Sequence, residues 1–235
     1  MLALIGAMED EVAGIQVALT DTEIQDFAGR PVVLGRYDGG QAAVVQAGVG
    51  KVNAAMCAQM LIDRYAPDAI VNTGIAGSLN PGIRIGELVL SRDAVQHDLD
   101  ASTFGYAPGQ VPDLDVFSFS ADEELRMLAK EAAAAALPGL SCHEGRVLTG
   151  DQFIGSQEKK DWLIRTFSGD CCEMEGGAIA QVCHVNRVPF LIVRAISDSA
   201  DNSAEIDYPA FEQKAIANSV KLSLELIRRY ALMKH

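Results

Sequence analysis

The stretch Pro189-Phe-Leu-Ile-Val-Arg-Ala-Ile-Ser-Asp198 is an apolar run of the length of a buried strand, and it ends in polar residues. Upstream, Cys172-Glu-Met-Glu-Gly-Gly177 is typical of a second strand that turns into a helix at Glu175. In α/β proteins, ligands bind at the carboxyl ends of the strands. A guanidinium and carboxylates are costly to bury there unless they pair or take part in chemistry. The two stretches therefore predict an α/β fold with a functional edge.

The rest of the chain supports that fold class, because apolar runs alternate with helical patterns throughout. We expect one domain over residues 1–235, built around a mainly parallel sheet. The expected strands are Leu2–Ile5, Pro31–Tyr37, Ala42–Ala47, Ala69–Thr73, Glu87–Ser91, Glu144–Leu148 and Phe190–Ile196. The expected helices are Glu9–Leu19, Val52–Tyr65, Asp122–Ala136, Gln157–Phe167, Gly176–Asn186 and Tyr208–Met233. In the last helix, Asp207 is expected to be the cap and Pro209 to lie in the first turn.

Composition excludes several classes of partner. The formal net charge of −13 argues against nucleic acid and anionic membranes as the main partner, since both need clustered Lys and Arg. No apolar run approaches the length of a membrane span, and Met1–Gly6 has neither the basic start nor the length of a signal peptide. The five cysteines are odd in number and mostly lie in apolar runs, which favours reduced, buried thiols in a cytoplasm. The pair Cys171-Cys172 is interpreted as core packing.

Two glycine-containing segments follow apolar strands. Ala47-Gly-Val-Gly-Lys51 departs from the phosphate-loop spacing, because Val45 takes the first glycine position and Val52 follows the lysine. Its glycines indicate a tight turn where backbone approaches a ligand or another helix. Asn72-Thr-Gly-Ile-Ala-Gly-Ser78 ends another strand in the same way. Together they predict a sheet edge stripped of side chains, against which a flat ligand can lie.

Acidic and aromatic residues at other junctions leave alternatives open. Glu9 and Asp10 are explained by the helix macrodipole, whereas for Glu11 a catalytic role is an equal alternative. Core packing is the default for Phe153 and Ile154, with base stacking as the other interpretation. Glu173 and Glu175 would share a face in an extended segment and diverge if a helix starts at Glu175, which the following glycines favour.

The loop between residues 97 and 118 is rich in Asp, Gly and Pro. Its His97, Asp98 and Asp100 are expected to be solvated, and we assign no metal. Phe104, Tyr106 and Pro112 are apolar groups that a lone surface loop does not need. They are expected to cover a substrate or a neighbouring subunit.

Six segments, in order, resemble the bacterial 5′-methylthioadenosine/S-adenosylhomocysteine nucleosidases of the nucleoside phosphorylase superfamily. They are GAMEDE from residue 6, QAGVGKVNAA from 46, NTGIAGS from 72, GDQFI from 150, CEMEGGAIAQVCH from 172 and RAISDSAD from 194. The resemblance implies a three-layer α/β/α sandwich around a twisted mixed sheet. It also implies a homodimer in which each subunit contributes to the other's pocket, with no cofactor.

The resemblance also assigns roles to residues of this chain. Asp198 would protonate adenine N7, Glu11 would activate the attacking water, Glu175 would bind the ribose hydroxyls, and Arg194 would hold the water and the carboxylates. Met174 would pack on the sugar, Phe153 and Tyr208 would lie beside the base and ribose, and main-chain groups of Phe153 and Ile154 would read the adenine edge. The remaining expected substrate contacts are Met8, Val49, Ile75, Ala76, Gly77, Glu173 and Ser197, and from the partner subunit's copy of this chain Ala101, Phe104 and Pro112.

The chain departs from the family pattern at two positions. Ile75 stands where Ser or Thr is frequent, which removes a side chain able to hold the water. Tyr208 stands where Phe is frequent and adds a polar group near the 5′ position.

The predicted reaction is hydrolysis of an N-glycosidic bond in an adenine nucleoside. A phosphorylase needs convergent Arg or Lys donors for phosphate, and the first loop supplies Met8, Glu9 and Glu11 instead. For Asp198 to hold a proton near neutral pH, its pKa must be raised. A nucleoside-binding module without catalysis is the alternative from another class, but binding alone has little use for buried acids at positions 11, 175 and 198.

Overall fold

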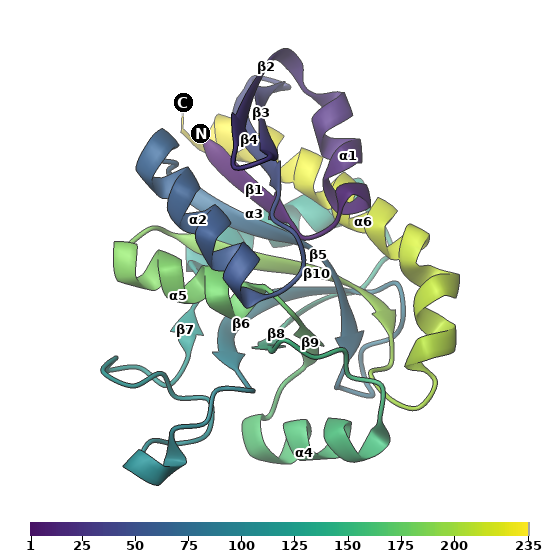
Figure 1. Ribbon diagram of the computed structural model, residues 1–235. Helices are drawn as coiled ribbons and strands as arrows, with labels where there is room; N and C mark the ends of the chain where they lie inside the picture. The colour runs from purple at the N-terminus through teal and green to yellow at the C-terminus, as the bar shows by residue number, and fades with distance from the viewer. Residues whose placement is uncertain (235) are drawn as a thin grey trace.

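Ten strands form one mixed sheet, with helices on both sides (Figure 1). The computed structural model describes residues 1–234. The strands are β1 (Leu2–Gly6), β2 (Thr20–Phe27), β3 (Arg30–Tyr37), β4 (Gly40–Gln46), β5 (Ala69–Ser78), β6 (Leu88–Gln96), β7 (Phe119–Ser120), β8 (Cys142–Thr149), β9 (Cys171–Glu173) and β10 (Phe190–Asp198). The helices are α1 (Glu9–Ala18), α2 (Lys51–Tyr65), the 3₁₀ turn η1 (Ser102–Phe104), α3 (Glu123–Ala136), α4 (Gln157–Phe167), α5 (Gly176–Asn186) and α6 (Ala204–Met233).

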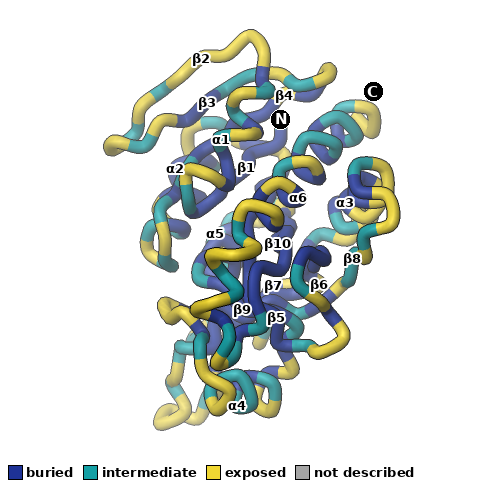
Figure 2. The backbone as a smooth tube through the Cα atoms, turned by 90° about the vertical axis from the view of Figure 1, so that its right-hand side faces the viewer, coloured by how far each residue is buried: buried dark blue, intermediate teal, exposed yellow. Residues whose placement is uncertain are grey.

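Helices cover both faces of the sheet, so the predicted α/β architecture is confirmed. On one face, α6 packs on β10, β5 and β4, and α1 and α3 pack on α6. On the other face, α2 packs against α5. The strands between these layers are the most buried part of the chain (Figure 2). Every residue of β5 and β10 is buried, which explains their nearly continuous apolar sequences.

Part of the sheet closes on itself. Strand β5 pairs with β10, β10 with β6, β6 with β8, β8 with β9, and β9 again with β5. The register of the parallel β5–β10 pair places Arg194 beside Gly74 and Asp198 beside Gly77, with an irregularity just before Asp198. Such irregularities re-aim a side chain. The closed ring therefore brings the polar end of β10 against the glycines of β5.

Several sequence expectations need correction. Asn72–Ser78 does not end a strand, because β5 runs through it to Ser78. The polar strand β2 was not expected, since it is mostly exposed at the sheet edge and pairs only with β3. The two-residue strand β7 was not expected either, whereas β9 is the strand predicted to precede the turn into a helix at Glu175. The remaining expected strands and helices are present, with ends that shift by a few residues.

The start of α6 was also predicted wrongly. The helix begins at Ala204, so Asp207 is not its cap and Pro209 lies inside it. Ser203 precedes the helix, and its hydroxyl donates to Asp207 Oδ2 at 2.6 Å. A proline within a helix removes one backbone hydrogen bond, which is why sequence rules place it in the first turn.

We expect Pro209→Ala to stabilise the protein, because alanine restores the N–H that can bond to the Glu205 carbonyl. The free energy of unfolding, measured by urea denaturation, should rise by about 1–3 kcal/mol. Pro138→Ala, in the turn after α3, is the matched control and should lower it by about 0.4–1 kcal/mol. Equal or lower stability of Pro209→Ala would contradict this account of α6.

Candidate active site

A cavity of about 220 Å³ opens where the ends of β5, β9 and β10 meet the N-terminus of α1. It lies among segments that are far apart in sequence. Its lining residues are Ala7, Met8, Glu11, Val49, Ile75, Ala76, Gly77, Gln152, Phe153, Ile154, Cys172, Glu173, Met174, Glu175, Ser197, Asp198 and Tyr208.

The cavity brings together all but four of the residues predicted for the site. Arg194 lies behind the lining, and Ala101, Phe104 and Pro112 lie on the separate segment between β6 and β7. Three lining residues were missed, namely Ala7, Gln152 and Cys172. Each is the sequence neighbour of a predicted residue, and that adjacency was the available signal.

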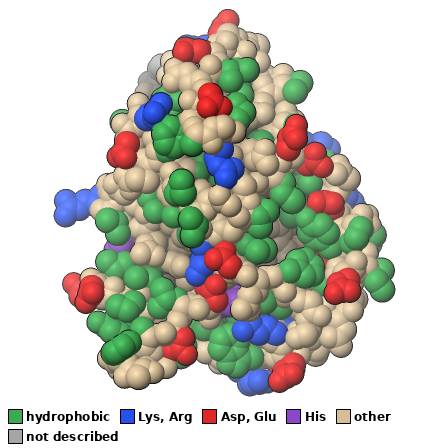
Figure 3. Space-filling model, viewed as in Figure 1, with side chains coloured by type: hydrophobic (Ala, Val, Ile, Leu, Met, Phe, Trp, Pro, Cys, Tyr) green, Lys and Arg blue, Asp and Glu red, His purple; other side chains and the backbone are tan. Residues whose placement is uncertain are grey.

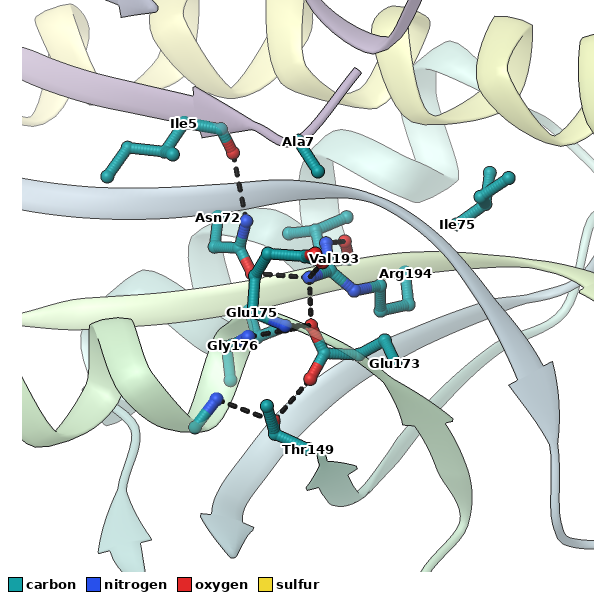
Figure 4. A network of polar contacts seen from close by, with 12 residues as sticks. Ile5, Ala7, Asn72, Ile75, Thr149, Glu173, Glu175, Gly176, Val193 and Arg194 are labelled. Carbon is teal, nitrogen blue, oxygen red and sulfur yellow. Dashed lines mark hydrogen bonds and ion pairs between the residues drawn. The ribbon is translucent and has the colours of Figure 1, made fainter. Parts of the chain in front are cut away.

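Arg194 is the buried cation beneath the cavity, with 2% of its surface exposed (Figure 4). Its Nη2 donates to Glu173 Oε2 and to Asn72 Oδ1, and it lies 3.9 Å from Glu175 Oε2. The Asn72 amide in turn donates to the Ile5 carbonyl at 2.9 Å. The guanidinium is therefore fixed in place, and buried charge is neutralised by carboxylates from β9 and the start of α5.

Glu173 is the principal partner of Arg194, and its carboxylate is occupied by the protein itself. Oε2 accepts the backbone N–H groups of Glu175 at 3.0 Å and Gly176 at 2.7 Å, and Oε1 accepts the Thr149 hydroxyl. Glu173 thus caps the N-terminus of α5. The predicted divergence of Glu173 and Glu175 is wrong, because both carboxylates approach the same guanidinium.

Glu11 belongs to the first turn of α1 and lines the cavity, with 4% of its surface exposed. Its Oε2 accepts the N–H groups of Ala7 at 2.7 Å and Met8 at 3.0 Å, and Oε1 accepts that of Ile75 at 3.1 Å. Burial raises the pKa of Glu11, while Arg194 and the three N–H groups oppose that rise. Glu11 therefore caps α1 and also faces the cavity, whereas Glu9 and Asp10 are exposed as the macrodipole interpretation expects.

Asp198 lies at the other end of the cavity in a different environment. Its Oδ1 accepts the Ala200 N–H at 2.7 Å, and its Oδ2 accepts the Ser197 hydroxyl at 2.8 Å. Burial raises the pKa of Asp198. The hydrogen bonds from Ala200 and Ser197 oppose that rise, and the nearby carboxylates of Asp207 and Asp201 add to it. Asp198 has no guanidinium partner among the described residues, so its surroundings favour the protonated form.

Glu175 is the third buried acid. Its Oε1 accepts the Gly50 N–H at 2.8 Å from the start of α2. Burial raises the pKa of Glu175 to about 7, with Glu173 contributing in the same direction and Arg194 in the opposite one. A carboxyl group with this pKa exchanges its proton near neutral pH.

Two glycines of β5 provide the space for these acids. A Cβ at Gly74 would lie 2.4 Å from Glu11 Oε1 and 2.9 Å from Arg194 Nη1, and a Cβ at Gly77 would lie 2.7 Å from Asp198 Oδ1. The sequence predicted that a flat ligand would lie against this bare backbone. In the structure, the carboxylates of Glu11 and Asp198 and the guanidinium of Arg194 approach it. The two glycines are three residues apart, roughly 10 Å along β5, so Glu11 and Asp198 approach this strand at separate points.

Aromatic side chains form the open side of the cavity. The rings of Phe153 and Tyr208 meet edge to face with centroids 5.8 Å apart, and Phe153 is 53% exposed. Core packing is therefore not the role of Phe153. Ile154 is buried in a small apolar cluster beside α4. The Tyr208 hydroxyl donates to Glu212 Oε1 at 2.8 Å.

Burial corrects the interpretation of two residues in the loop between 97 and 118. His97 and Asp98 are not solvated, because His97 is 2% exposed and Asp98 pairs with Lys51, while Asp100 is exposed. Within residues 1–234, no cluster of three or more His, Cys, Asp or Glu is arranged to hold a metal ion. All five cysteines are free, and four of them are buried, Cys171 and Cys172 included. No helix among the described residues has the length and apolarity to cross a membrane.

Comparison with known proteins places this geometry in a family. The phosphorylase superfamily profile matches residues 1–228. A 5′-methylthioadenosine/S-adenosylhomocysteine nucleosidase of Geobacillus thermodenitrificans is 42% identical over 226 residues, which cover 96% of this chain and 95% of the relative. The chain belongs to this nucleosidase family.

Solved structures of the family have the same fold. The Neisseria meningitidis nucleosidase in complex with methylthio-immucillin-A is 37% identical, with a TM-score of 0.93 and coverage of 97% of this chain and 98% of that one. The Colwellia psychrerythraea nucleosidase in complex with adenine is 34% identical, with a TM-score of 0.93 and coverage of 97% and 94%. The family resemblance inferred from the six segments is therefore confirmed.

We expect Gly74→Ala to abolish activity and lower stability, because its Cβ would overlap the Glu11 carboxylate and the Arg194 guanidinium. The free energy of unfolding should fall by about 2 kcal/mol or more. Gly155→Ala, whose Cβ would meet only the Phe153 ring at 3.6 Å, is the control for stability. Retention of both properties by Gly74→Ala would disprove the close approach at β5.

A second prediction concerns Glu175→Gln. A carboxyl whose pKa is raised by folding stabilises the protein below the unfolded pKa near 4.5, and this contribution is lost as pH rises toward about 7. Glutamine imitates the neutral form, so its stability relative to wild type should increase between pH 4.5 and 7 by on the order of 1–3 kcal/mol and then stay level. Urea unfolding at pH 5 and pH 8 measures this, with Glu158→Gln on exposed α4 as the control. A difference independent of pH would contradict the assignment.

Proposed function

We propose that this chain hydrolyses the N-glycosidic bond of 5′-methylthioadenosine and S-adenosylhomocysteine, and of 5′-deoxyadenosine, releasing adenine and the 5-substituted ribose. The observation that carries the proposal is the pair of buried acids at opposite ends of one cavity. Burial raises the pKa of both acids, but the Arg194 guanidinium opposes the rise only for Glu11, whereas the carboxylates of Asp207 and Asp201 add to it for Asp198. Environments that separate two acids in this way identify a base and an acid.

Asp198 is the general acid in this mechanism. Cleavage of the bond leaves negative charge on the departing adenine, and a proton delivered to N7 neutralises it. The Ser197 hydroxyl donates to Asp198 Oδ2, and the Ala200 N–H donates to Oδ1. The carboxyl is thereby held in one orientation.

Glu11 is the base that primes the attacking water. The ribose carbon that loses adenine develops positive charge. A water molecule hydrogen-bonded to the Glu11 carboxylate can attack this carbon from the face opposite the departing adenine. Glu11 and Asp198 approach β5 at separate points, beside Gly74 and Gly77, and both line the cavity in which the sugar and the water would lie between them. Ile75 cannot hold this water with its side chain, and its N–H already donates to Glu11.

Ribose and adenine are held by the remaining lining. Glu175 accepts the ribose hydroxyls, Met174 packs on the sugar, and Arg194 holds the carboxylates from behind. Phe153 and Tyr208 lie beside the base and the ribose. Main-chain groups of Phe153 and Ile154 read the adenine edge. The other lining contacts proposed are Met8, Val49, Ala76, Gly77 and Glu173, of which Glu173 acts through Arg194 and the α5 N-terminus.

Water is favoured over phosphate as the nucleophile. The cavity lining contains neither Lys nor Arg, and the nearest guanidinium, Arg194, is occupied by Glu173 and Asn72. Phosphate binding needs convergent cationic donors or open helix N-termini, and the N-terminus of α1 is closed by Glu11. These features support a hydrolase within the superfamily.

We propose that the active form is a cytoplasmic homodimer of one-domain subunits spanning residues 1–235, of which residue 235 lies outside the described residues. Phe104 in η1 is 82% exposed, and hydrophobic side chains gather at the lower left of Figure 3, near the segment between β6 and β7. Ala101, Phe104 and Pro112 of this segment would complete the pocket of the partner. On the same face, Lys and Arg appear as scattered single side chains, in keeping with a small-molecule substrate.

Adenine release tests the proposed function. Purified protein should release adenine from 5′-methylthioadenosine at the same rate with and without phosphate, and a panel of 5′-substituted adenosines and a futalosine-type nucleoside ranks the substrates. Asp198→Asn should lower kcat by roughly 10²–10⁴ while leaving the unfolding transition unchanged. Asp161→Asn on α4 is the control. Phosphate-dependent release would favour a phosphorylase, and a nearly fully active Asp198→Asn would remove this acid from the mechanism.

A further inference from the structure

Three charged residues tie together three segments that are distant in sequence. The Lys51 ammonium donates to Asp98 Oδ1 at 2.6 Å, and the Lys51 backbone N–H donates to Asp151 Oδ1 at 2.8 Å. The Asp151 backbone N–H donates to Asp98 Oδ2 at 2.9 Å. This closed set, called here the Lys51 clamp, joins the start of α2, the end of β6 and the segment after β8. The ammonium and the Asp98 carboxylate are 19% and 16% exposed.

The clamp fixes the peptide that contacts Glu175. Gly50 immediately precedes Lys51, and its N–H donates to Glu175 Oε1 at 2.8 Å. Gly50 has φ 97°, a conformation that favours glycine, and a Cβ there would lie 3.1 Å from Asp151 Oδ1. Because Lys51 is held by both its backbone and its side chain, the preceding N–H has little freedom to leave the carboxylate.

We propose that the Lys51 clamp is a positioning device for the active site, which holds the Gly50 N–H on Glu175 so that this carboxylate stays oriented and ionised to accept the ribose hydroxyls. The inference rests on the proposed function for the role of Glu175. Lys51, Asp98 and Asp151 do not line the cavity and act only through Gly50.

Charge balance explains why one N–H matters. Glu175 faces Glu173 from β9, Arg194 from β10 and Glu11 from α1, in addition to the Gly50 N–H. Burial and Glu173 raise its pKa to about 7, whereas Arg194 and the Gly50 N–H hold that rise back. His97 lies near the clamp, but burial lowers its pKa to about 4, so it is neutral in the working range. Movement of the Gly50 N–H away from Glu175 therefore shifts this carboxyl group toward its protonated form at neutral pH.

The direct test is the titration of Glu175 itself. In protein labelled with ¹³C at the glutamate carboxyl, the Glu175 resonance is assigned by its loss in Glu175→Gln. Lys51→Met should raise the midpoint of this resonance by about one pH unit, as expected for loss of a hydrogen bond to a charged group. Lys130→Met, which removes a lysine paired with Glu144 on the exposed side of α3, is the matched control and should leave the midpoint unchanged. An unchanged midpoint in Lys51→Met overturns the inference, whether or not the chain is a nucleosidase.

Kinetics tests the consequence for catalysis. In Lys51→Met, kcat/KM for 5′-methylthioadenosine should fall about 10-fold at pH 6 and approach wild type to within about threefold at pH 9, because the carboxylate regains its charge as pH rises. Lys51→Arg should retain most activity at both pH values. A loss of equal size at all pH values indicates a structural role and contradicts the proposal. If wild type itself releases no adenine, the proposed function fails, and the titration still decides the clamp.

A second variant protects the test against misfolding. Asp98→Asn removes the ion pair but keeps an oxygen that can accept the Asp151 N–H. It should show the same dependence on pH as Lys51→Met with a smaller loss, and Asp100→Asn, on the exposed neighbouring turn, should match wild type. Thermal unfolding of each variant shows that the compared proteins are folded.

Discussion

The burial of the Arg194 guanidinium is the constraint on which the rest of the structure depends. A buried cation must be neutralised and its donors must be bonded. Glu173 and Asn72 accept from Nη2, Nη1 donates to the Val193 carbonyl, and the buried Nε is left without a partner among the described residues. Glu173 simultaneously caps α5 through the N–H groups of residues 175 and 176. One guanidinium therefore fixes the relation between β5, β9, β10 and the first turn of α5. Glu175 receives its place in the cavity as a consequence.

The cavity contains three acids whose ionised forms are costly to bury, although the proposed reaction needs some of them ionised. Burial raises the pKa of Glu11, Glu175 and Asp198, so their ionised forms are disfavoured in the folded chain. Fixed N–H groups and Arg194 counteract this for Glu11 and Glu175, and Asp198 is left without such a cation. Glycines at 74 and 77 make the arrangement possible, because any side chain there would occupy the space of a carboxylate.

Much of the fold could be predicted from sequence patterns. Helices α4 and α5 have the predicted ends, since each combines helical periodicity with clear start and stop residues. Strand β2 could not be predicted, because its exposed polar residues lack alternation and it exists only by pairing with β3. The start of α6 was misplaced because local rules put a proline in the first turn, whereas the helix begins at Ala204, five residues before Pro209. The ring of five strands follows from long-range pairings that have no local signal.

The sequence by itself determined the residue types at the strand ends, and the six family segments determined which acids, aromatics and glycines belong to one site. Only the tertiary structure decided which of the acids is free for chemistry. Glu173 and Glu175 differ by two positions in the chain and both line the cavity. The Glu173 carboxylate accepts from Arg194, Thr149 and helix N–H groups, whereas the Glu175 carboxyl accepts the Gly50 N–H and has a pKa near 7. The physical reason is that the ionisation of a buried carboxyl depends on the charges and donors around it in space, and these come from segments up to 125 residues away, as Gly50 does for Glu175.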